Sequence, residues 1–218
     1  MKPRSAAQSS PKSISYEPLF WLFMAGNLLG VLLEGVWCLA VHHHWETHVT
    51  TIWGPFNVVY GVGAVCMYLA AAKSASWRLW QRFLLFTGVG TVVEWLVAII
   101  QERVFHAVSW DYSSMRFSLG GRISLLMSLI WGVLDLLFSM LAVPLIDRCL
   151  ARTESALRRK ITFALCIYMS ANLALSLIIL VRWGIGRTGT AEAGLLRLLD
   201  LLYPSDYLSR RFVEWVLL

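Results

Sequence analysis

The chain is dominated by long apolar runs that are separated by short polar stretches. A hydrocarbon core about 30 Å thick is crossed by roughly 20 apolar residues in helical form. Because lipid offers no partners to backbone N–H and C=O groups, a spanning segment is either a helix or part of a closed barrel. The runs do not alternate as barrel strands do. The pattern therefore predicts an all-α, polytopic transmembrane helical bundle. Its five expected spanning helices cover residues 18–41, 55–72, 83–105, 123–146 and 161–183.

Polar or amphipathic segments flank this predicted transmembrane bundle of residues 17–183. Residues 1–16 are rich in Lys, Ser and Pro, which predicts a disordered arm on the cytoplasmic side. In residues 184–218, leucines recur at helical spacing and are interrupted by Pro204. Neither piece reaches spanning length, so we predict an amphipathic tail that lies along the membrane interface or against the bundle.

Composition and charge exclude a soluble catalytic domain. Hydrophobic residues make up 58% of the chain and charged residues only 15%, whereas soluble domains carry about 25% charged residues. The net charge of +6 does not indicate nucleic-acid binding, because the Lys and Arg residues lie between the apolar runs. Most of the Lys and Arg residues lie in the N-terminal arm and in the loops that are expected on the same side of the membrane as that arm. The positive-inside rule therefore predicts a cytoplasmic N-terminus, and the predicted partner is the lipid bilayer.

Three acidic residues, Glu34, Glu94 and Asp135, lie well inside apolar runs. A charge exposed to lipid at mid-bilayer costs about 2.5–3.5 kcal/mol, so such side chains face the protein interior or a wet cavity. Each shares a helical face with other polar residues, as Asn27 does with Glu34. We predict a polar intramembrane or gating site, although each residue alone also fits a polar clamp between helices. The candidates are Asn27, Glu34, Glu94, Asp111, Arg122 and Asp135.

An unusual loop precedes the fourth apolar run. Residues 110–113 read Trp-Asp-Tyr-Ser, and residues 120–122 read Gly-Gly-Arg. Trp and Tyr suit the headgroup level, the glycine pair permits a sharp entry into a helix, and Asp111 is expected to pair with Arg116 or Arg122. An interfacial anchor and a functional re-entrant loop fit equally well. The residues of this loop motif are Trp110, Asp111, Tyr112, Gly121 and Arg122.

No metal or cofactor is predicted from the sequence. Histidines crowd residues 42–48, and His44 and His48 would share one face of a helix, which makes them the only candidate ligands. Their spacing matches no zinc signature, so we interpret the segment as a water-facing polar loop. The cysteines, including Cys38, are interpreted as small buried apolar residues. Residues 184–189 match GxGxxG, but no βαβ unit surrounds them.

Five short stretches, taken together, resemble a known family. They are Gly30-Val-Leu-Leu-Glu34, then Gly54-Pro-Phe56 with Tyr60-Gly-Val-Gly63, then Thr91-Val-Val-Glu94, the loop motif, and Gly121-Arg-Ile-Ser-Leu125 with Ser128 to Trp131-Gly132. In this order they are similar to the type IV ABC-transporter permeases (CmpB-like), which are bacterial multi-pass membrane proteins. The resemblance covers about residues 20–147. It implies a permease-like subunit in the bacterial cytoplasmic (inner) membrane, with a separate cytoplasmic ATPase or another membrane subunit as its partner.

Three functions remain open at this point. The first is that permease-like subunit, which would need a separate ATPase because the chain has no Walker A phosphate-binding loop. The second is a non-transporting membrane scaffold or regulatory protein, in which the polar residues are clamps. The third is a membrane-embedded lipid enzyme using Glu94 or Asp111 as an acid or base. Since no nucleophile or metal motif accompanies these acids, we predict no catalytic residues. A GxxxG pattern at Gly26 and Gly30 indicates close helix packing, within the chain or in a homo-oligomer.

Overall fold

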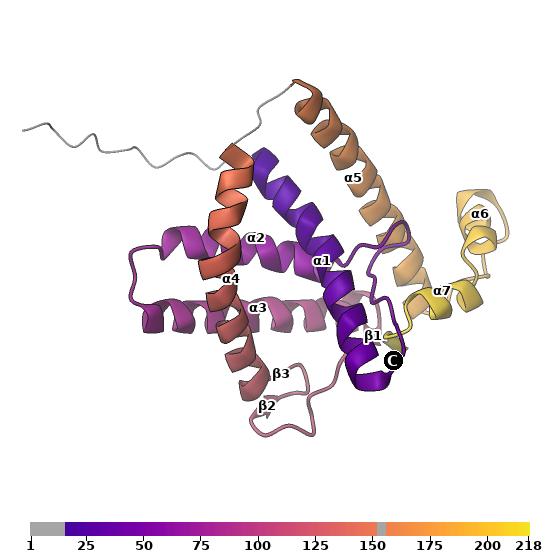
Figure 1. The fold of residues 1–218 in the computed structure, drawn as a ribbon. Coiled ribbons are helices and arrows are strands. Elements are labelled where there is room, and N and C mark those ends of the chain that lie inside the picture. The colour runs from indigo at the N-terminus through magenta and orange to yellow at the C-terminus, as the bar shows by residue number, and fades with distance from the viewer. Residues whose placement is uncertain (1–15, 152–155) are drawn as a thin grey trace, which may run out of the picture.

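The computed structural model describes residues 16–151 and 156–218, and the described chain is mainly helical (Figure 1). This confirms the predicted all-α class. The expected arm of residues 1–16 lies outside the described residues except for its last position. The helices are α1 (Tyr16–His42), α2 (Val58–Lys73), α3 (Leu79–Val104), α4 (Leu125–Ala151), α5 (Ala156–Gly184), α6 (Gly194–Leu202) and α7 (Ser205–Arg211). Short strands are β1 (Ala107–Val108), β2 (Ser118–Leu119), β3 (Ile123–Ser124) and β4 (Val216–Leu217).

Four of the described helices, α1, α3, α4 and α5, are long and apolar enough to cross a membrane. Helix α2 forms within the second expected span but has only 16 residues, which rise about 24 Å. It is therefore shorter than a typical hydrocarbon core of about 30 Å. Many large apolar side chains of the long helices are exposed on the surface of the protein, for example Leu33, Leu141 and Phe163. Such surfaces suit contact with lipid rather than with water.

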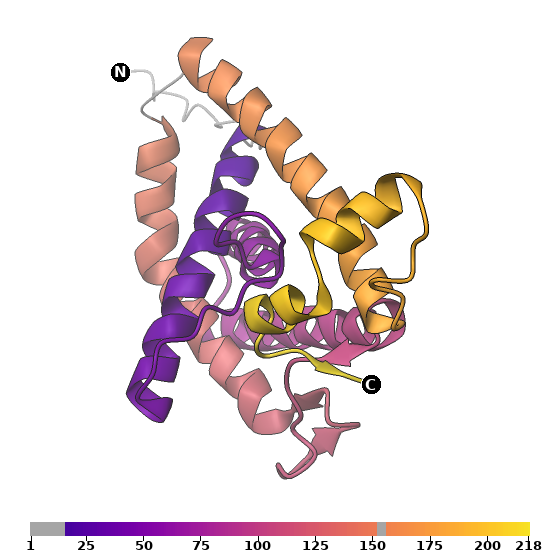
Figure 2. The same ribbon diagram turned by 90° about the vertical axis from the view of Figure 1, so that its right-hand side faces the viewer.

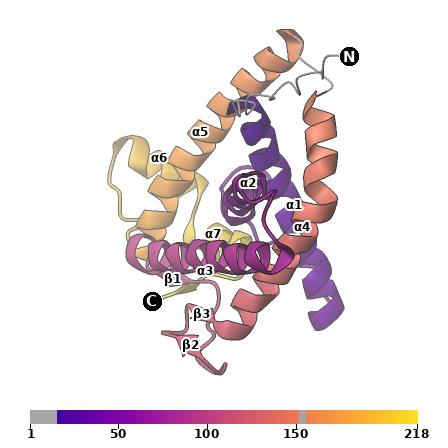
Figure 3. The same cartoon turned by 90° about the vertical axis from the view of Figure 1, so that its left-hand side faces the viewer.

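The helices cross one another instead of running as one parallel set. Helices α1, α4 and α5 share a general direction, while α2 and α3 run across them (Figure 1). After a quarter turn, α2 is seen nearly end-on and α3 still lies across the other helices (Figure 3). Helix α1 packs on α2, and α3 packs on α4. The crossed arrangement brings side chains of α1, α2, α3 and α4 toward one interior.

The contact between α1 and α2 uses the glycines of the GxxxG pattern. A Cβ atom added at Gly26 would lie 2.9 Å from both Ala64 Cβ and Tyr60 O, and one at Gly30 would overlap the Tyr60 ring. The pattern therefore permits close packing inside the chain. Asn27, on the same face, is fully buried, and its backbone carbonyl accepts a hydrogen bond from Asn57 N–H (3.3 Å).

Gly30→Ala is expected to destabilise the protein, because the new methyl group would force the Tyr60 ring to move. Overpacking of this kind costs about 1–3 kcal/mol. Gly63 on α2 offers a matched control, since a Cβ atom there would meet nothing within 4 Å. Gly63→Ala should be neutral or stabilising by up to about 1 kcal/mol through helix propensity. The midpoint of thermal unfolding in detergent tests this, and equal midpoints for the two variants would contradict the packing account.

The C-terminal tail packs against the helices and does not stand alone. Figure 2 shows α6 and α7 beside α5, with the C-terminus returning toward β1. Strand β4 pairs with β1 in antiparallel register, and Leu208 and Phe212 of the tail are fully buried. Arg182 of α5 forms an ion pair with Asp200 of α6 at 2.9 Å. The Arg211 side chain donates hydrogen bonds to the backbone carbonyl of Thr51.

Candidate functional site

Glu94 of α3 belongs to a cluster of polar side chains that lies between the helices. Its side chain is buried, and Oε1 accepts a hydrogen bond from the Tyr112 hydroxyl at 2.9 Å. The indole of Trp131 on α4 contacts the same carboxylate. Burial, the charge of Glu94 and this hydrogen bond raise the pKa of Tyr112. The tyrosine therefore stays protonated and acts as the donor.

Glu34 of α1 is joined to this group through Tyr60 of α2. The Tyr60 hydroxyl donates a short hydrogen bond to Glu34 Oε1. The ring of Tyr60 lies against that of Trp131, with centroids 6.5 Å apart, and Tyr60 also interacts electrostatically with Glu94 and Tyr112. We call Glu34, Tyr60, Trp131, Glu94 and Tyr112 the polar pathway. Its members come from four helices and the loop after α3, and the rings of Tyr60 and Trp131 lie between its two hydrogen-bonded pairs.

His48, in the loop after α1, lies between two carboxylates. Its Nδ1 is 3.5 Å from Glu34 Oε2, and its Nε2 is 3.1 Å from Glu46 Oε2. Hydrogen bonding to Glu34, and next to Glu46, outweighs the opposing effect of burial and raises the pKa of His48 to about 9. The imidazolium form therefore balances part of the negative charge at neutral pH. His44 Nε2 is 2.5 Å from the other oxygen of Glu46, and hydrogen bonds from both histidines lower the pKa of Glu46.

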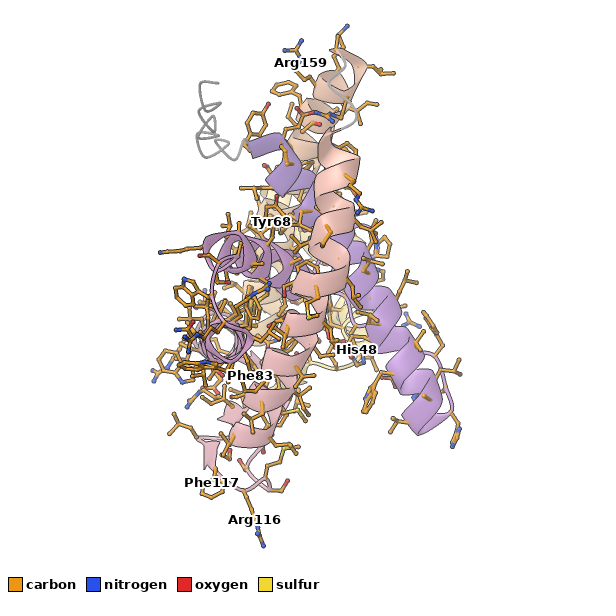
Figure 4. All side chains as sticks on the ribbon, turned by 60° about the vertical axis from the view of Figure 1, so that its left-hand side comes forward. His48, Tyr68, Phe83, Arg116, Phe117 and Arg159 are labelled. Carbon is orange, nitrogen blue, oxygen red and sulfur yellow. The ribbon has the colours of Figure 1, made fainter. Side chains whose placement is uncertain are left out.

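Residues of the loop motif mainly shape the loop itself. The Trp110 indole donates to Arg122 O (3.0 Å), and Tyr112 N–H donates to Gly121 O (2.8 Å). Asp111 is exposed, and its Oδ1 accepts hydrogen bonds from the backbone and hydroxyl of Ser113. The expected pairing of Asp111 with arginine is therefore replaced by a local turn. The tip of the loop, with Arg116 and Phe117, points away from the helices (Figure 4).

Arg122 pairs with Glu102, near the end of α3, at 2.5 Å. The pair lines a cavity of about 270 Å³ between the loop and α3. Gln101 also lines the cavity, and its amide donates to Ser109 Oγ at 2.6 Å. Arg122 therefore lines a cavity of mixed polar and apolar character, apart from the polar pathway. Of the loop motif, Tyr112 is the residue that reaches the polar pathway.

Asn27 and Asp135 are buried but belong to other parts of the interior. The Asn27 amide nitrogen donates to Phe23 O within α1 at 2.8 Å, and the same side chain lies against Gly61 of α2. Asn27 Oδ1 and Asp135 Oδ2 accept no hydrogen bond from the residues that the structure describes. Within that same part of the chain, no hydrogen bond or ion pair joins Asp135 to Glu34 or Glu94. Buried oxygens of this kind call for a bound water or another donor.

Several contributors to these groups were not among the predicted site residues. Tyr60 and Trp131 lie in stretches that resemble the family but were not predicted to belong to the polar site, and Glu46 was predicted only to lie in a polar loop. Glu214 of the tail is half-buried. Desolvation of its carboxyl raises its pKa to about 7, and its charge acts on His48. The sequence signal for Tyr60 was its place four residues after Phe56 in a stretch that resembles the family. For Glu214 we find no comparable signal.

These features define a helical integral membrane protein with a polar group buried between its helices. Residues 21–177 match the model of the family described as "Putative ABC-transporter type IV". The match covers well over half of the chain, so the protein belongs to this family. The matched range extends beyond the resemblance found in residues 20–147 and includes most of α5. No curated protein and no solved structure matches the chain.

Proposed function

We propose that the protein is the permease-like subunit of an ABC transporter in the bacterial cytoplasmic membrane. Energy would come from a separate cytoplasmic ATPase. The observation that carries the proposal is the polar pathway, which gathers Glu34 and Glu94 from different helices of a membrane protein. Ionisable side chains inside a membrane protein commonly mark a solute or ion route. Membership of the family supports the same function.

The chemistry of the pathway favours a solute that carries positive charge or hydrogen-bond donors. Glu34 and Glu94 each accept a hydrogen bond from a tyrosine hydroxyl, and a solute could replace either tyrosine as the donor. Low local dielectric strengthens such contacts. Trp131 lies between the two halves of the pathway and supplies an aromatic face for a cation.

The distribution of basic residues supports a cytoplasmic N-terminus. Arg158 at the start of α5 donates to Glu17 at the start of α1 (2.8 Å), so these two helix ends lie together. Arg159 lies at this same end (Figure 4), and Lys160 follows it. Positive charge flanking apolar helices favours the cytoplasmic side. The same end would therefore meet the ATPase.

Charge reversal at this end is expected to weaken binding of the ATPase. The protein would be purified from native membranes in mild detergent, and co-purifying chains would be identified by mass spectrometry. Wild type should retain a nucleotide-binding ATPase, and Arg159→Glu with Lys160→Glu should reduce its yield by roughly tenfold, or about 1.4 kcal/mol. Both residues are exposed.

Arg116→Glu provides the matched control, because Arg116 is also exposed but lies at the loop tip away from this end (Figure 4). It should leave the ATPase yield unchanged. Absence of any ATPase from the wild-type preparation would count against the proposal. Equal losses in the control and the double variant would instead contradict the assigned docking end.

A further inference from the structure

Three potential metal ligands meet where α1 passes into the following loop. Cys38 Sγ lies 3.7 Å from His48 Nε2 and 4.0 Å from Glu46 Oε2. His48 Nε2 and Glu46 Oε2 are 3.1 Å apart. One sulfur, one imidazole nitrogen and one carboxylate oxygen therefore face a common centre, and Cys38 is buried.

These separations match the edges of a tetrahedral metal site. Zn²⁺ lies about 2.3 Å from cysteine sulfur and about 2.0–2.2 Å from histidine nitrogen or carboxylate oxygen. Tetrahedral angles then place the ligand atoms roughly 3.3–3.6 Å apart. The three separations, between 3.1 and 4.0 Å, lie on either side of this range. Shifts of a few tenths of an ångström would complete the geometry.

We propose that Cys38, Glu46 and His48 bind a divalent transition-metal ion and that the donor set fits Zn²⁺ best. Thiolate and imidazole are the ligands that zinc prefers, whereas Mg²⁺ and Ca²⁺ select oxygen. Binding would release one proton from the His48 imidazolium and one from the Cys38 thiol. The resulting thiolate and the Glu46 carboxylate would balance the two positive charges of the ion. The fourth position would be filled by water or by His44, which already contacts Glu46.

The surroundings orient these ligands as they do in known metal sites. Glu34 Oε2 lies 3.5 Å from His48 Nδ1, which leaves Nε2 directed at the proposed ion. A carboxylate behind a metal-bound histidine fixes its tautomer and its ring orientation. The loop is held in position because the Asn57 amide donates to His48 O at 3.0 Å. His48 lies beside the C-terminal half of α1 (Figure 4).

The ion would tie this loop to α1 next to Glu34, at one end of the polar pathway. It would be a separate property of the molecule, since it requires neither transport nor an ATPase. The charge of Glu214, in the tail, also acts on Cys38 and His48.

Cobalt substitution tests the site directly. The protein would be purified with a tag that lacks histidine, stripped with chelator and titrated with Co²⁺ alone. Wild type should develop a thiolate-to-cobalt charge-transfer band at one ion per chain, and added Zn²⁺ should displace it. Cys38→Ser should lose the band, and His48→Ala should weaken binding by at least about tenfold. Cys66→Ser and His43→Ala are the matched controls and should behave as wild type.

A second measurement keeps the test independent of variant folding. In wild type, Zn²⁺ should slow alkylation of Cys38 but not of Cys66, another free thiol. Absence of a charge-transfer band in wild type, or its persistence in Cys38→Ser, would overturn the proposal. Equal protection of the two cysteines would also overturn it. None of these readouts depends on transport, so this inference and the proposed function can fail separately.

Discussion

Glu94→Gln is expected to reduce ATP-dependent solute movement by at least about tenfold while leaving the protein folded in the membrane. Gln has nearly the same volume, and its amide oxygen can still accept the hydrogen bond from Tyr112. The negative charge is lost, however, and with it the attraction for a cationic or hydrogen-bond-donating solute. Stability should be unchanged or slightly raised, because a buried carboxylate is costly.

The solute for this measurement would be found by comparing cells that lack the gene with cells that carry it. Mass spectrometry of internal and external solutes would identify those whose distribution depends on the wild-type protein. Glu192→Gln is the matched control, since it makes the same chemical change at an exposed position of the tail. Full activity in Glu94→Gln, at normal abundance, would remove Glu94 from the proposed route and favour a polar clamp.

Gly121→Ala is expected to cause the largest loss of stability among single methyl additions in the loop. Gly121 has a φ of +72°, a left-handed conformation that costs other residues about 1–2 kcal/mol. The added Cβ would also lie 2.5 Å from Asp111 Oδ1 and 2.8 Å from Ser113 Oγ. Strain and overpacking together should cost roughly 2–4 kcal/mol. Gly121 O accepts a hydrogen bond from the backbone N–H of Tyr112. A shift of Gly121 should therefore displace Tyr112 and weaken the hydrogen bond from its hydroxyl to Glu94.

Gly186→Ala separates the two contributions to that loss. Gly186 has a φ of +67°, but a Cβ atom there meets nothing within 4 Å. It should therefore show only the backbone cost of about 1–2 kcal/mol. Thermal unfolding in detergent measures both variants. If they lose the same stability, the contact of Gly121 with the Asp111 turn contributes nothing.

The helices could be predicted from the sequence because lipid imposes a simple requirement on backbone groups. The close packing at Gly26 and Gly30 could be expected for a related reason, since only small residues let two helices approach. Burial of Glu94 also followed from the cost of exposing charge to lipid. In each case one local property of the chain decides the outcome.

Features that depend on several elements could not be predicted in this way. The crossing of α2 and α3 over the other helices is set by side-chain packing, which an apolar run does not specify. Tyr60 and Trp131 enter the polar pathway only because this crossing brings α2 and α4 together. Asp111 was expected to pair with an arginine, but the nearer Ser113 supplies its hydrogen bonds.

The histidine loop shows the same limit. Spacing within residues 42–48 gave no zinc signature, so the loop was interpreted as water-facing and without metal. The third ligand of the proposed site would be Cys38 of the preceding helix, which is close in sequence but lies among apolar neighbours. Cys38, Glu46 and His48 come together only because the loop folds back on α1, which the spacing of the histidines does not indicate.

ATP-driven flux in proteoliposomes tests the proposed function most directly. The protein would be reconstituted together with the ATPase that co-purifies with it, and solutes would be measured inside and outside the vesicles. We predict movement of a cationic or hydrogen-bond-donating solute that requires ATP and is lost in Glu94→Gln. An assembly that lacks an ATPase, or vesicles that show no ATP-dependent movement of any solute, would contradict a permease and point to a scaffold.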